Sequence, residues 1–483
     1  MTNWLESSAL DIAQGIRDQQ VSATEILNLQ IARIERVNPA INALAVDRFE
    51  TARVEARVAD EHLATGVDVS TLPPFFGVPC TIKEFLACED MPHTGGLLGR
   101  KDHIAREDST VVARLKASGA IIMGSSNIPE GGLWMETHNL IYGRTKNPWN
   151  VKHTPGGSSG GEAALIAAGA SPLGIGSDVG GSVRIPAAFC GITGHKPTGG
   201  LVPNTGHFPP ISPAGGRYLV TGPMGRRVRD IRALLEVMAG PDGHDGACEP
   251  MIWRQKGPLD LKGLRVFPVP KPGKLSVRPE MQAVVERAAL ALESRGAQIE
   301  TRTFPALKKS IQIWAAMLSE ASDEGYDVIL GCGEPAPMVR ELMKVPFGRS
   351  RHSYPAAIIG AVEKLTHRFT GSMTKYIELG RVLQAELEEA LGPNGVLIYP
   401  PYTRPAPRHH WAFATPFDAA CTALFNVMEF PVTQVPICLS KSGLPMGVQV
   451  VGQRQNDGLT LAVAEQLELE FGGWQLAPTA DLT

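Results

Sequence analysis

The sequence is poor in several features that would point to particular classes of protein. Its seven cysteines are scattered, odd in number and without a CxxC pair, which argues against a disulfide framework and against a zinc site. A formal net charge of -3 favours neither nucleic acid nor anionic lipid as a partner. No run of about eighteen apolar residues occurs, so we expect no membrane span.

The N-terminus also lacks the features of a targeting segment. The stretch MTNWLESSALDIAQGIRD carries Glu6 and Asp11, and no basic segment followed by an apolar run is present. Together with the scattered cysteines, this predicts a reducing, cytoplasmic location. Hydrophobic residues make up 43% of the chain and charged residues 20%, which is typical of a globular protein with a large core.

Strands and helices are predicted to alternate along the chain. Short apolar strands are expected at 77–83, 120–124, 172–176, 264–268, 396–399 and 447–451. Helices are expected after the capping box of Ser22 and Glu25 and at 49–66, 161–169, 230–239, 279–295, 374–391, 418–428 and 458–470. This alternation, without a long-period repeat, predicts an α/β layer structure with helices on both faces of a sheet. Residues 331–373 have little periodicity and many Pro and Gly residues, which suits either a lid or a variable surface insertion.

Two clusters of glycine and serine are separated by one predicted helix and one predicted strand. They are PGGSSGGE at 155–162 and SDVGGS at 177–182, and their spacing can bring Ser158 and Ser182 to the same sheet edge. Neither cluster matches the phosphate-binding patterns GxxxxGK[ST] or GxGxxG, so a nucleotide site is disfavoured. Converging glycine N–H groups can instead form an oxyanion hole, which fits Ser182 as a nucleophile.

A serine nucleophile needs a base, and two residues are candidates for that role. His195 lies nearest in sequence, but no histidine is flanked by a catalytic motif and no GxSxG elbow is present. Lys83 ends an apolar strand in VPCTIKEF, and a buried, neutral lysine can act as a base. On its own, a lysine at a strand end is more often a surface residue.

The stretch GGSSGGEAALIAAGASPLGIGSDVGGSVRIPAAFCGITGHKPT, at 156–198, closely resembles the signature region of the amidase signature family. The similarity continues in GVPCTIKE around Lys83, in YGRTKNPWN at 142–150 and in GLPMGVQVVGQ at 443–453, and it is weakest at about 250–400. This resemblance implies one amidase signature domain over 1–483, with its core at about 75–240. It also implies a large mixed, twisted sheet covered by helices on both faces.

Carried over residue by residue, the resemblance implies a Ser–cisSer–Lys triad that works through an acyl-enzyme, with no metal or cofactor. Ser182 is then the nucleophile, Ser158 the relay and Lys83 the base. The implied oxyanion hole consists of the N–H groups of Val179, Gly180, Gly181 and Ser182. Supporting roles fall to Ser159, Ser177, Asp178 and Arg184, although turn residues are an equally good interpretation of the two serines.

Substrate-binding residues are less sharply indicated. The segment NIPEGGLWMETHNL, at 127–140, aligns with a loop near the acyl site of the family, which makes Gly131, Gly132 and Trp134 candidates. Four further residues could line a pocket, although core packing is the commoner role for each: Trp314, Met317, Phe347 and Trp411. Cys190 has no partner base and is interpreted as a packing residue.

Details of the match indicate a branch of the family. Ile185 and Gly199 replace the Gln and Tyr that are usual in the amidotransferase subunit of tRNA-amidating complexes. Glu84 and Phe85 after the lysine, with GHKPTGGLVPNTGHFPP at 194–210, resemble the second type of fatty-acid amide hydrolase.

The resemblance therefore implies an amidase for aryl, alkyl or fatty-acyl amides, with esters and carbamates as further substrates. The alternative is an amidotransferase-type subunit. We expect a small-molecule amide as partner and no nucleic acid, and a homodimer is left open.

Overall fold

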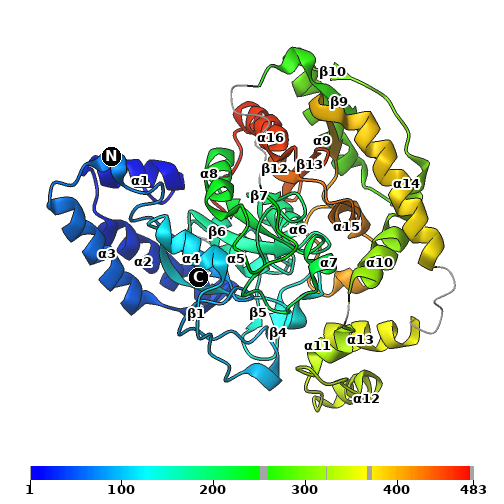
Figure 1. Cartoon of the computed structure of the whole chain (residues 1–483), viewed down its shortest axis with the longest axis horizontal. Coiled ribbons are helices and arrows are strands. Elements are labelled where there is room, and N and C mark those ends of the chain that lie inside the picture. Colours follow the sequence, from blue (N-terminus) through cyan, green and yellow to red (C-terminus); the bar gives the residue numbers. More distant parts are fainter. Residues whose placement is uncertain (1, 251–258, 323, 367–372, 479–483) are drawn as a thin grey trace.

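The computed structural model describes residues 2–250, 259–322, 324–366 and 373–478. Within these ranges, eleven strands form one mixed sheet (Figure 1). In order across the sheet they are β1 (Leu44–Asp47), β3 (Ile121–Ser126), β2 (Pro79–Lys83), β6 (Leu173–Asp178), β8 (Val220–Gly225), β7 (Thr193–Lys196), β12 (Val432–Leu439), β13 (Pro445–Val451), β11 (Gly395–Tyr399), β9 (Arg265–Pro268) and β10 (Gln298–Ile299). The neighbouring strands β3, β2 and β6 are parallel to one another, and so are β11, β9 and β10. From β6 across β8, β7, β12 and β13 to β11, each strand is antiparallel to the next. A separate hairpin-like pair joins β4 (His138–Asn139) to β5 (Gly143–Arg144).

Helices surround this sheet. They are α1 (Ala9–Arg17), α2 (Ala23–Ile41), α3 (Phe49–Ala64), α4 (Thr110–Ala117), α5 (Gly160–Ala167), α6 (Arg184–Cys190), α7 (Pro213–Gly216), α8 (Val228–Met238), α9 (Pro279–Ser294), α10 (Ser310–Ala321), α11 (Tyr326–Leu330), α12 (Met338–Lys344), α13 (Tyr354–Thr366), α14 (Met373–Leu391), α15 (Ala420–Val427) and α16 (Asp457–Phe471). The capping box predicted at Ser22 is formed, with Glu25 as its partner. Among the helices described, none combines the length and the apolar character needed to cross a bilayer.

The sheet separates two apolar layers, and strand β11 shows why. Val396 and Ile398 belong to the core that also contains apolar residues of α9 and α16. Leu397 and Tyr399 belong to a second core, formed with α10, α14 and α15. Because successive side chains of a strand point to opposite faces, one apolar run supplies both layers. The predicted α/β fold, with a large mixed sheet between helical layers, is confirmed.

The same alternation on β2 directs Lys83 toward the second face. Cys80 and Ile82 pack into the core shared with α2 and α8. Thr81 and Lys83 therefore point the other way. On that face the Thr81 hydroxyl donates a hydrogen bond to the carboxylate of Glu162, on α5. The strand thus delivers a buried lysine to the side of the sheet on which α5 begins.

Most of the strongly patterned elements were predicted within a few residues of their observed bounds. The strand predicted at 77–83 is β2, and the helix predicted at 279–295 is α9. Several elements were missed, including the helices α6 and α10 and the strands β7, β8 and β12.

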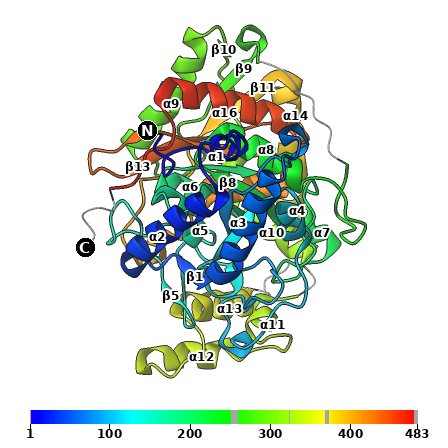
Figure 2. The ribbon, with the colours of Figure 1, turned by 90° about the vertical axis from the view of Figure 1, so that its left-hand side faces the viewer.

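Although residues 331–373 show little periodicity in the sequence, the part of this segment that the structure describes contains the helices α12 and α13. Pro337 and Pro355 stand at helix starts, where a missing N–H costs no hydrogen bond. Met338 and Ala357 pack with Tyr326 of α11 in a small core of their own. In both views α11, α12 and α13 gather at one end of the molecule (Figures 1 and 2). Residues 367–372 lie outside the described ranges, and the role of this segment as a lid stays a prediction.

Helix α5 packs very closely on its neighbours because glycines face them. Gly161 donates its N–H to the carbonyl of Asn127 at 3.2 Å. A Cβ on Gly161 would lie 2.5 Å from both the nitrogen and the oxygen of Asn127. Gly174 and Gly176 of β6 similarly leave no room beside Glu162 and Ser159. The start of α5, whose N-cap residue Ser159 follows Ser158, is therefore fixed by close packing.

We predict that Gly161→Ala lowers the free energy of unfolding by about 1–3 kcal/mol, because the backbone of Asn127 cannot yield as a flexible side chain can. Gly246→Ala is the matched control, since no heavy atom lies within 4 Å of a Cβ built on Gly246. Its effect should stay within about 0.5 kcal/mol. Urea denaturation measures both variants, and equal stabilities would contradict the packing argument.

Candidate active site

Lys83, Ser158 and Ser182 come from three separate segments that meet on one face of the sheet. Lys83 ends β2, Ser158 precedes α5, and Ser182 lies in the turn between β6 and α6. The Nζ of Lys83 lies 2.7 Å from the Oγ of Ser158, within hydrogen-bond distance. Lys83 is 0% exposed and Ser158 is 3% exposed, whereas Ser182 is partly exposed. The three residues thus run from a buried amine to a hydroxyl that solvent can reach.

The two glycine–serine loops are joined through their backbone. Ser159 donates its N–H to the carbonyl of Ser182 at 3.1 Å. Within the described residues, no hydrogen bond links the Oγ atoms of Ser158 and Ser182. The peptide bond between Gly157 and Ser158 is cis, as the family resemblance implies. A Cβ on Gly157 would lie 2.5 Å from the carbonyl oxygen of Trp134, so the loop can approach this closely only with glycine there.

Burial changes the acidity of the lysine. It lowers the pKa of Lys83 to about 7, while the carboxylates of Asp178 and Glu162 act in the opposite direction. The Nζ also donates to the Oγ of Ser177 at 3.0 Å and to its carbonyl at 3.3 Å. A substantial share of the amine is therefore neutral near pH 7, and a neutral amine can accept a proton.

Asp178 shapes the turn that carries Ser182. Its carboxylate accepts the N–H of Gly181 at 2.7 Å and the N–H of Val183 at 3.1 Å. In the described part of the chain, the N–H groups of Val179, Gly180 and Ser182 donate to no protein acceptor. The prediction that all four N–H groups from 179 to 182 serve an oxyanion therefore differs from the structure at Gly181. Its N–H is already used by the neighbouring carboxylate.

Two side chains from outside the glycine–serine region hold the peptide planes of this turn. The Nε1 of Trp314, on α10, donates to the carbonyl of Val179 at 2.9 Å. The Oγ1 of Thr422, on α15, donates to the carbonyl of Gly180 at 2.7 Å. The C=O and N–H of one trans peptide point in opposite directions. Fixing the Val179 carbonyl against Trp314 therefore turns the Gly180 N–H away from that ring.

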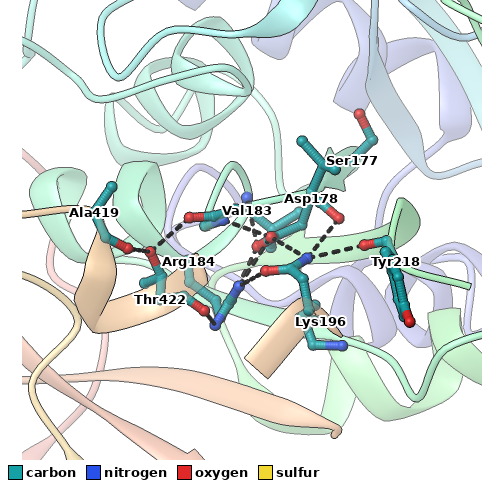
Figure 3. Close-up of polar contacts among 12 residues, drawn as sticks. Ser177, Asp178, Val183, Arg184, Lys196, Tyr218, Ala419 and Thr422 are labelled. Atoms are coloured by element: carbon teal, nitrogen blue, oxygen red, sulfur yellow. Dashed lines mark hydrogen bonds and ion pairs between the residues drawn. The ribbon is translucent and has the colours of Figure 1, made fainter. Parts of the chain in front are cut away.

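Asp178 and Arg184 form the fully buried ion pair that the sequence suggested (Figure 3). The Nε and Nη2 of Arg184 each lie 2.9 Å from a different oxygen of Asp178. The other Arg184 donors reach the carbonyl of Thr422 and the side-chain oxygens of Gln449 and Asn426. Burial alone would raise the pKa of the Asp178 carboxyl, but the charge and hydrogen bonds of Arg184 hold it well below its usual range.

The two supporting serines lie next to each other. The Oγ of Ser159 lies 3.3 Å from both the carbonyl and the nitrogen of Ser177. The Oγ of Ser177 in turn lies 2.9 Å from the Nε2 of His207, a residue that the sequence did not single out. Neither serine is a simple turn residue, since Ser177 contacts the lysine and Ser159 holds Ser177.

The three substrate-binding candidates lie between Ser158 and the α11–α13 segment. Gly131 has a positive φ of 61° and a Cβ there would meet the ring of Tyr326 at 3.1 Å. Gly132 faces the ring of Phe85, and a Cβ would come within 3.2 Å of it. The carbonyl of Trp134 lies against Gly157, and its ring stacks 4.6 Å from that of Phe413.

The other candidates divide into core and surface residues. Met317 is buried in the second core, as expected. Phe347 and Trp411 are 76% and 53% exposed, so the core-packing interpretation is wrong for both, since each lies in a short, exposed 3₁₀ turn. Trp314 combines partial burial with its hydrogen bond to the carbonyl of Val179, in the turn that carries Ser182.

His195 and Cys190 take no part in the site. His195 is buried, 3.2 Å from a carboxylate oxygen of Asp457 and 2.9 Å from Thr433 Oγ1. The Cys190 thiol is buried and contacts the carbonyl of Pro155, which confirms its interpretation as a packing residue. Across the residues described, no group of three or more His, Cys, Asp or Glu side chains is arranged to hold a metal ion.

We predict that Arg184→Met lowers the free energy of unfolding by about 3–5 kcal/mol, because it leaves the buried charge of Asp178 without its partner. Arg295→Met is the matched control. Arg295 pairs with Glu470 at 2.7 Å, but the two side chains are 32% and 41% exposed. Loss of that surface pair should cost less than about 1 kcal/mol. Similar losses for the two variants in urea denaturation would refute the role assigned to the buried pair.

Comparisons with known proteins identify the family to which the chain belongs. The Amidase family model matches residues 25–461. The chain is 39% identical to fatty-acid amide hydrolase 2 of Homo sapiens, covering 97% of this chain and 89% of that protein. It is 32% identical to an acylamidase of Rhodococcus erythropolis, over 96% and 95% of the two chains. A solved structure of 6-aminohexanoate cyclic dimer hydrolase with substrate superposes with a TM-score of 0.80 at 28% identity, over 99% of both chains. The chain therefore belongs to the amidase signature family, whose members hydrolyse amide bonds.

Proposed function

We propose that this protein is a serine amidase for linear, fairly hydrophobic carboxylic amides, with Ser182 as nucleophile, Ser158 as relay and Lys83 as base. One observation carries the proposal more than any other. A completely buried lysine amine lies 2.7 Å from a serine hydroxyl in the loop that the sequence marks. Such a lysine is costly to fold and has no ion-pair partner within bonding distance among the described residues, so a chemical role explains its presence.

The proposed cycle moves one proton along the three residues. Neutral Lys83 accepts the proton of Ser158 as Ser158 accepts that of Ser182, and the Ser182 oxygen attacks the acyl carbon. The proton then returns through Ser158 to the nitrogen of the leaving amine, and the C–N bond breaks. Water attacks the acyl-enzyme along the same proton route and releases the acid. No metal or cofactor has a step in this scheme.

Stabilisation of the oxyanion is assigned to the N–H groups of Val179, Gly180 and Ser182. They lack protein acceptors within the described residues, and Val179 and Gly180 are partly exposed beside Ser182. Donors fixed before the reaction stabilise a developing negative charge without reorganisation. Asp178 and Arg184 hold the turn in shape, and Ser159 holds Ser177 and the loop of Ser182.

The substrate range is proposed from the residues around this centre. Gly131, Gly132 and Trp134 would border the acyl group, and the ring of Phe413 lies between those of Trp134 and Tyr354, at 4.6 and 4.9 Å. An aromatic wall of this kind suits aryl, alkyl or fatty-acyl groups. Fatty-acid amide hydrolase 2, at 39% identity, supports acyl amides as substrates. Esters and carbamates pass through the same kind of tetrahedral oxyanion, so urethane cleavage is included as a side activity.

Three chromogenic substrates with one shared arylamine leaving group test the proposal: a short acyl anilide, a long-chain acyl anilide and an aryl carbamate. We expect turnover of at least one, and a loss of at least about a thousandfold in Ser182→Ala, because the nucleophile is removed. Ser294→Ala, at an exposed helix end, is the matched control and should retain full turnover.

A loss of less than about tenfold in Ser182→Ala would contradict the assignment of the nucleophile. The preferred substrate decides between a small, a lipid-like and a urethane-tolerant pocket. No turnover of any substrate, together with a stable complex with other proteins on size exclusion, would favour the amidotransferase-type subunit instead.

We predict that kcat/KM rises between about pH 6 and 8 and then levels off, because only neutral Lys83 accepts a proton and burial lowers its pKa to about 7.

A variant tests which group causes this rise. Glu162→Gln removes a carboxylate that raises the pKa of Lys83, so the midpoint of the rise in kcat/KM should move to lower pH. Burial also raises the pKa of Glu162 itself to about 7. If the midpoint belonged to that carboxyl, the rise would disappear in the variant. A profile that is flat from about pH 6 to 9 would contradict Lys83 as the base.

A further inference from the structure

The amine of Lys83 has three oxygen neighbours, and two of them belong to one residue. These are the Oγ of Ser177 at 3.0 Å and its carbonyl at 3.3 Å, and the third is the Oγ of Ser158 at 2.7 Å. A neutral amine has two N–H groups and one lone pair. A base works only if that lone pair faces the proton to be taken, which here is the proton of Ser158. The Ser177 carbonyl can only accept a hydrogen bond, so some neighbouring group must make the Ser177 hydroxyl accept as well.

His207 decides the direction of the Ser177 hydroxyl. Its Nδ1 lies 3.2 Å from the carbonyl of Pro209, and a carbonyl can only accept, so Nδ1 carries the proton. Burial, followed by the nearby charge of Lys83, lowers the pKa of His207 to about 3, which keeps the ring neutral. The Nε2 of a neutral ring protonated at Nδ1 is an acceptor. It lies 2.9 Å from the Oγ of Ser177 and accepts a hydrogen bond from the hydroxyl of that serine.

The hydroxyl of Ser177 is then left with lone pairs toward Lys83. Both Ser177 oxygens accept the two N–H groups of the neutral amine, and the amine lone pair is directed at the hydroxyl of Ser158. If the Ser177 hydroxyl could rotate, it would donate to the lone pair of Lys83 and compete with Ser158. The rotation is opposed by the ring of His207, which is only 8% exposed.

Backbone hydrogen bonds fix the position of His207 relative to Lys83. Phe208 donates its N–H to the carbonyl of Phe85 at 2.8 Å, and Ala87 donates to Gly206 at 3.0 Å. The segment after Lys83 and the segment of His207 are thus paired, with a bridge between Leu86 and His207. The ring of His207 also lies 5.8 Å from that of Phe85.

We propose that His207 is a positioning residue, which acts through the Ser177 hydroxyl to aim the lone pair of neutral Lys83 at Ser158. This inference rests on the proposed function of Lys83 as the base. His207 contacts neither the nucleophile nor the oxyanion turn through any hydrogen bond among the described residues. Its effect should therefore depend entirely on the presence of the Ser177 hydroxyl.

A double-mutant cycle on the full-length enzyme tests that dependence. His207→Leu should lower kcat/KM by about tenfold in the presence of Ser177, the amount that one misdirected hydrogen bond is expected to cost. In a Ser177→Ala background there is no hydroxyl to misdirect, so the same change should cost less than about twofold. His207→Gln, whose amide oxygen can accept the hydroxyl proton, should recover most of the loss.

The opposite results would overturn the inference. Equal losses in the two backgrounds would mean that His207 only supports the fold, as would a loss that His207→Gln does not recover. An unchanged kcat/KM in His207→Leu would show that His207 does not position Lys83. If His207→Leu does not fold, as judged by thermal unfolding, His207→Met takes its place in the cycle, because it also lacks a hydrogen-bond acceptor of comparable strength. Retained activity in Ser182→Ala would instead refute the proposed function, which separates the two failures.

Discussion

The amino group of Lys83 is kept out of water at the end of β2, and much of the site follows from that constraint. Removing a charge from water favours the neutral amine, and two carboxylates, those of Asp178 and Glu162, oppose this. Their balance leaves the pKa of Lys83 at about 7. An amine in that range can both take a proton from a hydroxyl and give it back, whereas a stronger base would keep it.

Asp178 connects the charge of Lys83 with the shape of the turn that carries Ser182. The same carboxylate raises the pKa of Lys83, accepts the N–H of Gly181 and pairs with Arg184. The cation of Arg184 fixes both the position and the ionisation of this carboxylate. A change at Arg184 should therefore be felt at two places at once, in the backbone that faces the oxyanion and in the acidity of the lysine. The buried pair is in this sense part of the chemistry, although neither residue contacts the reacting atoms in the proposed scheme.

Local patterns predicted the parts of the molecule that depend on local sequence. The apolar run before Lys83 predicted β2, and the spacing of Ser158 and Ser182 predicted that one helix and one strand separate them. The hydrogen bond from Trp314 to Val179 has no such signal, because 135 positions separate the two residues. The hydrogen bond from Thr422 to Gly180 has no local sequence signal either, because 242 positions separate these two residues.

The sequence analysis also misjudged the N–H of Gly181 and overlooked His207, for different physical reasons. The N–H of Gly181 was assigned to an oxyanion because the resemblance specifies residues but not the direction of each N–H, and here it points at Asp178. His207 was missed because a histidine in a glycine- and proline-rich stretch has no distinguishing neighbours. Its role depends on the pairing of its segment with the residues after Lys83, which only the fold reveals.

Trp314 lies in the part of the chain where the family resemblance is weakest, yet it is bonded to the turn that carries Ser182, and this restricts how the proposed substrate range can change. Trp314 borders the oxyanion turn and also holds the Val179 carbonyl, so a smaller residue there would enlarge the space and release the peptide in one step. The ring of Phe413 contacts those of Trp134 and Tyr354, and the side chains of Phe413 and Tyr354 make no hydrogen bond to the turn among the described residues. Substitutions at these two rings can therefore alter the fit of an acyl group without moving the oxyanion donors. Changes at Phe413 or Tyr354 can thus act on the fit of the substrate alone, whereas a change at Trp314 alters the space beside Gly180 and the turn together.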